Sequence, residues 1–198
     1  GVRVVKFFPA GAFGGMKTLS TLAEVFEGVR FLPCGGVDNE NLADYVEAPF
    51  VQAVGGSWLC PADDVAAHNF EAVTARCKAA RAIVLGFTLG HIGVNAESAE
   101  ESLALCQTFR AAFGFDIWEM PASFFASSGV EVMKHSAVGT NGHIAILTNS
   151  VRRAEAELEK KGFALDLSTE KCIGGEPIAV YFQNMLGGFA VHLLKKGA

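Results

Sequence analysis

The 198-residue sequence contains no apolar run long enough to cross a membrane and no excess of positive charge. Its net charge of -5 offers no electrostatic attraction to nucleic acid or to an anionic membrane surface, so we expect neither as a partner. Five cysteines are an odd number, and they lack the close pairing of disulfide scaffolds and zinc sites. We therefore expect reduced thiols and a cytoplasmic location.

Apolar residues, in contrast, are abundant. They make up 51% of the chain, and aromatic residues make up 10%, which is enough to bury a sizeable core in one or two domains. The character of the sequence changes between residues 79 and 86, without a low-complexity linker. We predict a first domain over residues 1–82 and a second over 83–198, packed together or joined by a continuing helix.

A lysine interrupts the first strand-like run, Val4-Val5-Lys6-Phe7-Phe8-Pro9. Side chains alternate along a strand, so Val4, Lys6 and Phe8 lie on one face. The apolar residues around Lys6 and the apolar strand-like runs that follow predict that this strand is buried on both faces. Burial disfavours the charged amine and lowers its pKa, which creates a neutral nucleophile able to form a Schiff base with a carbonyl. The alternative is a strand-end lysine whose ammonium reaches water.

Two further strand-like runs, residues 29–36 and 51–58, carry paired glycines near their ends. Such pairs let a backbone approach a ligand closely and turn its N–H groups toward an anion. A helical segment follows each of the three strands, over residues 15–26, 38–46 with Asp38 as the N-cap, and 70–81. The pattern predicts three βα units and an α/β site that handles phosphate.

The motifs VKFFPA, FLPCGG and AVGGSWL, followed by Pro61-Ala62-Asp63, resemble the C-terminal part of 2-keto-3-deoxy-6-phosphogluconate / 4-hydroxy-2-oxoglutarate aldolase. That family is a (βα)8 barrel and a class I aldolase, which needs no cofactor. The resemblance implies that Lys6 is the Schiff-base lysine, that Phe8 packs beside the bound keto acid, and that the partner is a small keto acid or sugar-acid phosphate. The positions that it implies for substrate and phosphate binding are Cys34, Gly35, Gly36, Gly56 and Ser57.

Two departures from the family stand out. Cys34 occupies a position where the family usually has threonine, which weakens one hydrogen bond to the substrate. A barrel of this type needs on the order of 200 residues, whereas only about 80 precede the second domain. The glutamate that acts as general base in the family and its substrate-binding arginine have no counterpart. We expect either a piece of a longer protein or a truncated gene whose three βα units pack in another way.

The second half contains an internal duplication. Gly90-His91-Ile92-Gly93 is repeated as Gly142-His143-Ile144-Ala145, and a strand-like run with Glu131 three residues before a lysine is repeated with His192. We predict one strand, one helix and three strands in each copy, in modules 86–135 and 139–198. The helices are expected over residues 98–113 and 151–161, and the later strands over 115–120, 123–126, 130–134, 164–171, 178–184 and 189–194.

This repeated βαβββ order resembles the vicinal oxygen chelate family, which includes glyoxalase I and extradiol dioxygenases. The resemblance implies an α+β domain that forms a cup around a divalent metal such as zinc, nickel, cobalt, iron or manganese. The implied ligands are His91, Glu131, His143 and His192. The family usually has a proton-moving glutamate at the position of His192, so ordinary glyoxalase chemistry is not expected. The alternative is that the four side chains hydrogen-bond to each other without a metal.

Three functions remain open. The first is reversible aldol cleavage to pyruvate and an aldehyde by a partial barrel fused to a metal-binding domain. The second is a metal-dependent isomerase, lyase or dioxygenase in the second half, and the third is a non-catalytic oligomerisation or metabolite-sensing domain. A homo-oligomer is expected. We predict that His68 and His135 lie on the surface and that Trp58 and Trp118 belong to a core or interface.

Overall fold

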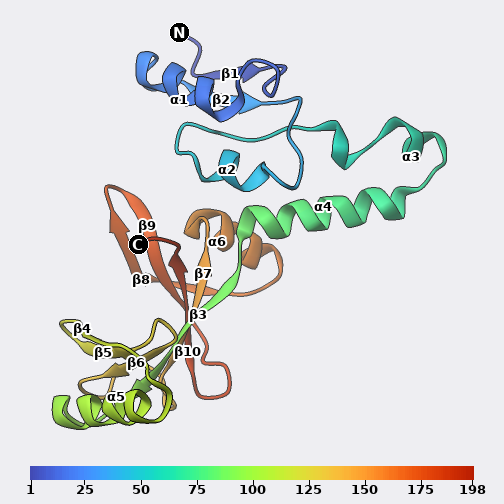
Figure 1. Ribbon diagram of the computed structural model, residues 1–198. Helices are drawn as coiled ribbons and strands as arrows, with labels where there is room; N and C mark the ends of the chain where they lie inside the picture. Colours follow the sequence, from blue (N-terminus) through green and yellow to red (C-terminus); the bar gives the residue numbers. More distant parts are fainter. The chain divides into compact units, whose positions relative to one another are not determined.

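The structure, a computed structural model, describes residues 1–198 and separates into two units, Gly1–Gly86 and Phe87–Ala198 (Figure 1). One unit contains a two-stranded sheet and the other an eight-stranded sheet. The mixed α/β character expected from the sequence is therefore confirmed. None of the helices combines the length and the apolar composition needed to span a membrane.

The first unit alternates strands and helices. Its elements are β1 (Val4–Phe7), α1 (Gly15–Val25), β2 (Arg30–Pro33), α2 (Leu42–Glu47), the 3-10 turn η1 (Ser57–Leu59), α3 (Ala62–Ala66) and α4 (Phe70–Leu85). Strands β1 and β2 run parallel, with Lys6 opposite Leu32. The core forms between α1, α2, α4 and β2, with α1 on β2 and α2 on α4, and its buried side chains include Leu19 and Phe31.

The third predicted strand is only partly formed. Two isolated parallel bridges, Phe31 to Val51 and Cys34 to Gly55, replace a continuous ladder over residues 51–58. Ser57 and Trp58 belong to the turn η1 instead. A strand needs a regular succession of partners, and this segment has bridging partners only at Val51 and Gly55.

The predicted start of α2 is wrong. Helix α2 begins at Leu42 rather than at Asp38. The Asp38 carboxylate accepts hydrogen bonds from the backbone N–H groups of Glu40 and Asn41, at 2.9 and 3.3 Å, and so closes a turn before the helix. An aspartate makes this local bond as readily as it caps a helix, and the sequence pattern does not distinguish the two.

The second unit consists of two successive sets of one strand, one helix and three strands. The first set is β3 (Thr88–Asn95), α5 (Ala99–Phe113), β4 (Ile117–Glu119), β5 (Ser123–Ala126) and β6 (Val130–Met133). The second set is β7 (His143–Thr148), α6 (Val151–Lys160), β8 (Leu165–Ile173), β9 (Glu176–Phe182) and β10 (Ala190–Lys195). The strands join in the order β4-β5-β6-β3-β7-β10-β9-β8, so the two sets meet where β3 pairs with β7.

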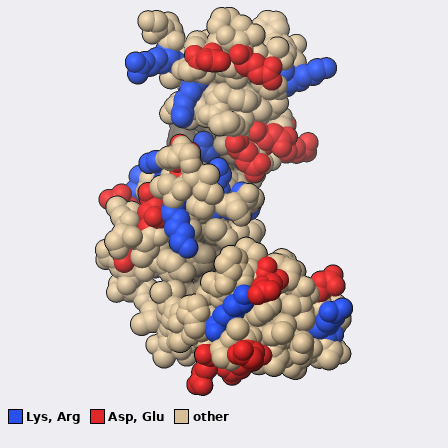
Figure 2. Space-filling model, turned by 90° about the vertical axis from the view of Figure 1, so that its left-hand side faces the viewer, with Lys and Arg blue, Asp and Glu red and all other residues tan.

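Both helices of this unit begin at a serine cap. Ser98 accepts a hydrogen bond from the backbone of Glu101, and Ser150 accepts one from Arg153. Helix α5 packs on β5 and β6, whereas α6 packs on β9 and β10. On the face of the molecule shown in Figure 2, acidic and basic side chains lie in small separate groups without a broad basic area.

Candidate functional site

The candidate site of the second unit is built from two neighbouring rows of residues across the central strands. One row joins His91, Ala145, His192 and Tyr181 through the pairing of β3, β7, β10 and β9. The adjacent row joins Glu131, Gly93, His143 and Ala190 through β6, β3, β7 and β10. Because residues two apart on a strand face the same side, both rows occupy one face of the sheet. Each imidazole therefore stands next to a small residue.

Three donor atoms form a nearly equilateral triangle. The Nε2 atoms of His91 and His143 are 3.1 Å apart, and Oε2 of Glu131 lies 3.1 Å from the first and 3.0 Å from the second. The two histidines are buried, and the Glu131 side chain is 16% exposed. The structure thus brings together three candidate ligands that the sequence places on three different strands.

Hydrogen bonds alone satisfy this triangle poorly. If both Nε2 atoms carry a proton and donate to Glu131, two N–H groups lie side by side with their nitrogens 3.1 Å apart, and the two histidines cannot hydrogen-bond to each other. Atoms that share one divalent ion at about 2.0 to 2.2 Å lie about 3 Å apart when they occupy adjacent positions around it. The spacing and the donor types therefore fit a metal ion, with His91, His143 and Glu131 as ligands.

His192 supplies a fourth donor near the triangle. Ring nitrogens of His91, His143 and His192 all lie within 4.8 Å of one another. Nε2 of His192 is buried without a hydrogen-bond partner, as is Nδ1 of His143. A buried nitrogen without a partner is costly, and an ion near it would remove that cost for His192.

Electrostatics favours the protonation states that bind metals. Burial lowers the pKa of His192 to about 4, and electrostatic interaction with the neighbouring imidazoles of His143 and His91 adds to this effect. Its imidazole is consequently neutral at pH 7, with a lone pair available. Burial alone would raise the pKa of Glu131, but hydrogen bonds with His143, His91 and Ser123 outweigh it and hold that pKa well below its ordinary value.

Ser123 holds the remaining oxygen of Glu131. Its hydroxyl donates to Oε1 at 2.6 Å, and the serine is 1% exposed. We expect Ser123→Ala to weaken metal binding about tenfold, because groups that orient a ligand have effects of about 10- to 100-fold. Ser102→Ala is the matched control, since Ser102 is also buried but donates to the Val132 carbonyl, at 2.7 Å. A titration against a chromophoric chelator measures both, and equal affinities would contradict the role of Ser123.

Two further site residues were not found from the sequence. Gly93 lies between Glu131 and His143, and a Cβ atom there would overlap the His143 ring. The duplication contained a signal for it, because Gly93 aligns with Ala145 in the repeated motif and both are small. Tyr181 stacks on His192 with ring centroids 4.7 Å apart, and no repeated motif points to it.

The first unit brings Lys6, Phe8 and Gly35 together. The Lys6 ammonium lies 5.4 Å from the centre of the Phe8 ring, and a Cβ atom at Gly35 would lie 2.9 Å from that ring. The loop after β1 is bonded to the loop after β2, because the N–H groups of Ala10 and Gly11 donate to the carbonyls of Cys34 and Gly35 at 2.8 and 2.9 Å.

The predicted burial of Lys6 is wrong. Lys6 and its face neighbour Val4 are exposed, and Phe8 is 62% exposed. Strand β1 pairs only with β2, so its other edge is open, and nothing covers the face that carries Lys6. The lysine is therefore near the Gly35 turn but in contact with water.

The other predicted phosphate-binding positions lie in two places. Gly36 contacts Gly11 in the paired loops after β1 and β2, whereas Gly56 and Ser57 lie at the start of η1.

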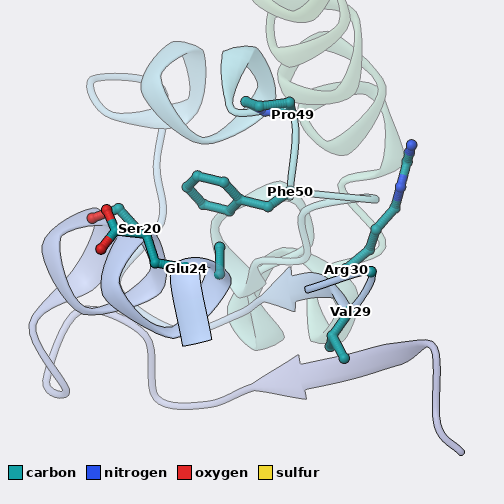
Figure 3. Close-up of a pocket in the computed structure, with 8 residues that line it drawn as sticks. Ser20, Glu24, Val29, Arg30, Pro49 and Phe50 are labelled. Carbon is teal, nitrogen blue, oxygen red and sulfur yellow. The ribbon is translucent and has the colours of Figure 1, made fainter. Parts of the chain in front are cut away.

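A separate hollow of about 440 Å³ lies at the opposite ends of these strands (Figure 3). Its lining comes from α1, from the start of β2 and from the segment before Val51, and includes Glu24, Arg30 and Phe50. It contains none of the predicted site residues. The predicted aldolase positions are instead at the carboxyl ends of the strands.

The structure agrees with the predictions for the two remaining histidines and for one of the two tryptophans. His68 and His135 are exposed as expected. Trp58 packs against the core of the first unit and donates its indole N–H to Asn39 at 3.0 Å. Trp118 is 41% exposed and stacks on Phe125, so it does not belong to a core.

Comparison with known proteins concerns the first unit most directly. The family model described as KDPG and KHG aldolase matches residues 1–76. This part of the chain is therefore similar to that aldolase family. The 2-dehydro-3-deoxy-phosphogluconate aldolase of Treponema pallidum is 52% identical over 75 residues, which are 38% of this chain and 36% of the relative. The chain thus spans little more than a third of the length of this curated relative.

Two solved structures are similar to separate parts of the chain. A KDPG aldolase from Legionella pneumophila, with pyruvate captured as a covalent carbinolamine, is 40% identical with a TM-score of 0.39, over 40% of this chain and 39% of that one. A methylmalonyl-CoA epimerase from Streptomyces coelicolor is 17% identical with a TM-score of 0.40, over 56% of this chain and 97% of that one. The description of the second unit rests on its own strand order and donor geometry.

Proposed function

We propose that residues 1–82 are the imine-forming part of a class I aldolase that cleaves 2-keto-3-deoxy-6-phosphogluconate or 4-hydroxy-2-oxoglutarate to pyruvate and an aldehyde. The observation that supports this proposal is the family match over residues 1–76, which includes the lysine strand and both glycine turns. The grouping of Lys6 with Phe8 and the Gly35 turn is consistent with it.

In this proposal, the Lys6 amine attacks the C2 carbonyl of the keto acid and water leaves to form the imine. The protonated imine accepts the electron pair of the breaking C3–C4 bond while the C4 hydroxyl gives its proton to a base, which yields an enamine of pyruvate and releases the aldehyde. Backbone N–H groups near Gly35, Gly36, Gly56 and Ser57 would hold the anionic end of the substrate. Cys34 would take the place of a hydroxyl donor there.

Exposure of Lys6 has a consequence for this chemistry. Aldol cleavage needs a positioned base to move protons, and no acidic side chain of the first unit bonds to Lys6. The open edge of β1 and the uncovered Lys6 face would have to be closed by further elements for a full catalytic cycle. We therefore propose imine formation for this chain and complete turnover only for an assembly that covers β1.

Trapping with pyruvate and borohydride tests the proposal on the full chain. Reduction of the imine leaves pyruvate bound to the lysine as a stable amine, and peptide mass spectrometry locates it. An adduct at Lys6 is the expected result. Absence of an adduct at Lys6, or equal labelling of every surface lysine, would contradict the imine-forming role.

A second candidate function is favoured by the donor triangle. We infer that residues 83–198 form a vicinal-oxygen-chelate-type domain that binds a divalent ion through His91, Glu131 and His143, with His192 as the fourth donor. A bound ion would act as a Lewis acid toward two adjacent oxygens of a ligand. With His192 in place of a carboxylate, a metal-dependent isomerase, lyase or dioxygenase fits better than an ordinary glyoxalase.

Metal analysis of the purified chain tests this second function. After loading and dialysis, we expect about one zinc, nickel, cobalt, iron or manganese ion per chain, and a large loss of metal in His143→Ala. His135→Ala is the control, because that histidine is exposed and outside the cluster. A chain that binds no metal but forms a stable dimer through the second unit would favour an oligomerisation or sensing role instead.

The five free cysteines support the cytoplasm as the proposed compartment.

A further inference from the structure

The imidazoles of the site lack the hydrogen bonds that usually orient metal-binding histidines. In most sites, the second ring nitrogen of such a histidine donates to a carboxylate, a carbonyl or a water. Here, Nδ1 of His143 is buried without a partner. Nδ1 of His192 has only the Leu193 carbonyl, at 3.3 Å, which is beyond the usual range of an N–H to oxygen bond.

Aromatic rings flank the two outer histidines instead. Tyr181 lies opposite His192 in the pairing of β9 and β10, and the two rings stack with centroids 4.7 Å apart and planes inclined by 28°. On the other side of the site, the rings of Phe125 and His91 are arranged edge to face, with centroids 5.4 Å apart and an angle of 85° between their planes. Stacked and edge-to-face arrangements are favourable and restrict ring rotation.

The central histidine is held between the outer two. His143 contacts the His91 ring at 5.2 Å and the His192 ring at 5.5 Å. Its orientation thus depends on theirs. The Phe125 ring is itself supported by Trp118, whose plane is parallel within 2° at 5.3 Å.

We propose that Tyr181 and Phe125 are positioning residues, which aim the His192 and His91 imidazoles at the donor triangle by ring packing in place of hydrogen bonds. The role belongs to the Tyr181 ring and not to its hydroxyl. The proposal rests on the metal centre proposed above, but it also predicts the behaviour of the imidazoles in the metal-free chain.

Substitutions at Tyr181 separate the ring from the hydroxyl. Co²⁺ is added to the metal-free full chain, and both its affinity and its visible absorption spectrum are measured. Tyr181→Phe keeps the ring and is expected to stay within about threefold of the parent affinity with an unchanged spectrum. Tyr181→Met replaces the ring with a smaller, flexible apolar side chain, and is expected to bind Co²⁺ about tenfold more weakly with an altered spectrum.

Phe125→Leu and Phe163→Leu form a matched pair for the other side. Phe125→Leu is expected to weaken Co²⁺ binding about tenfold. Phe163 also contacts an aromatic ring, Phe182, but lies outside the site, so Phe163→Leu should bind as the parent does. Equal affinities of Tyr181→Met and the parent would overturn the proposal, as would an equal loss in Tyr181→Phe and Tyr181→Met.

Imidazole NMR spectra of the metal-free chain distinguish this proposal from the metal centre itself. The parent and Tyr181→Phe are expected to show one set of His192 ring signals, displaced by the stacked ring, and Tyr181→Met is expected to lose that displacement. If the parent chain binds no Co²⁺ but shows this pattern, the metal function fails and the positioning role stands. If Co²⁺ binds and the His192 signals of Tyr181→Met equal those of the parent, the positioning role fails alone.

Discussion

Gly93→Ala is expected to lower the metal affinity of the second unit on the order of 100-fold. A Cβ atom at this position would overlap the ring of His143, which stands beside it on β7. Gly93 does not have a positive φ, so alanine adds no backbone strain and the effect is one of space. The His143 ring must turn away, and its Nε2 atom then leaves the triangle with His91 and Glu131.

Gly129→Ala is the control for this result. Gly129 lies directly before β6, has no atom within 4 Å of a Cβ, and also lacks a positive φ. The two variants therefore make the same chemical change, one on β3 and the other directly before the neighbouring strand β6. Overpacking at Gly93 should also lower the free energy of unfolding by about 1–3 kcal/mol. Competition titration gives the affinities, and a Gly93→Ala chain that binds metal like Gly129→Ala would refute the donor triangle.

Lys6→Met is expected to abolish borohydride-dependent labelling by pyruvate. Methionine has a length similar to the lysine stem but no amine, so an imine cannot form. Lys17→Met provides the comparison, because Lys17 is an exposed lysine of α1 in the same unit. Intact-mass spectrometry after reduction measures the labelled fraction. Persistent labelling of Lys6→Met, or its loss in Lys17→Met, would show that another lysine reacts.

The four candidate donors of the second unit could be named from the sequence because the duplication places equivalent residues at equivalent positions and the resemblance to the vicinal oxygen chelate family implies ligands at those positions. His91 and His143 occupy the same place in two repeated motifs, and β3 and β7 pair so that both reach one face. Glu131 and His192 follow in the same way on β6 and β10. Tyr181 has no repeated counterpart, and only the pairing of β9 with β10 reveals its place.

The burial of Lys6 could not be predicted from its own strand. An apolar run around a lysine indicates burial only if other strands and helices cover both faces. In the structure, β1 has one neighbouring strand, and its residues are largely exposed. The same reasoning applies to residues 51–58. This apolar run is predicted to be a strand, but it forms only two isolated bridges because no neighbouring strand pairs with it along its length.

By itself, the sequence determined the mixed α/β class, the approximate positions of α5 and α6, and, with the family resemblance, the four metal-binding candidates. These features depend on neighbours a few residues apart or on a repeated motif, and both can be read along the chain. Only the tertiary structure decided that Lys6 meets water, that three donor atoms approach to 3.0–3.1 Å, and that Tyr181 stacks on His192. The physical reason is that burial and side-chain distance depend on segments far apart in the chain, which the fold alone brings together.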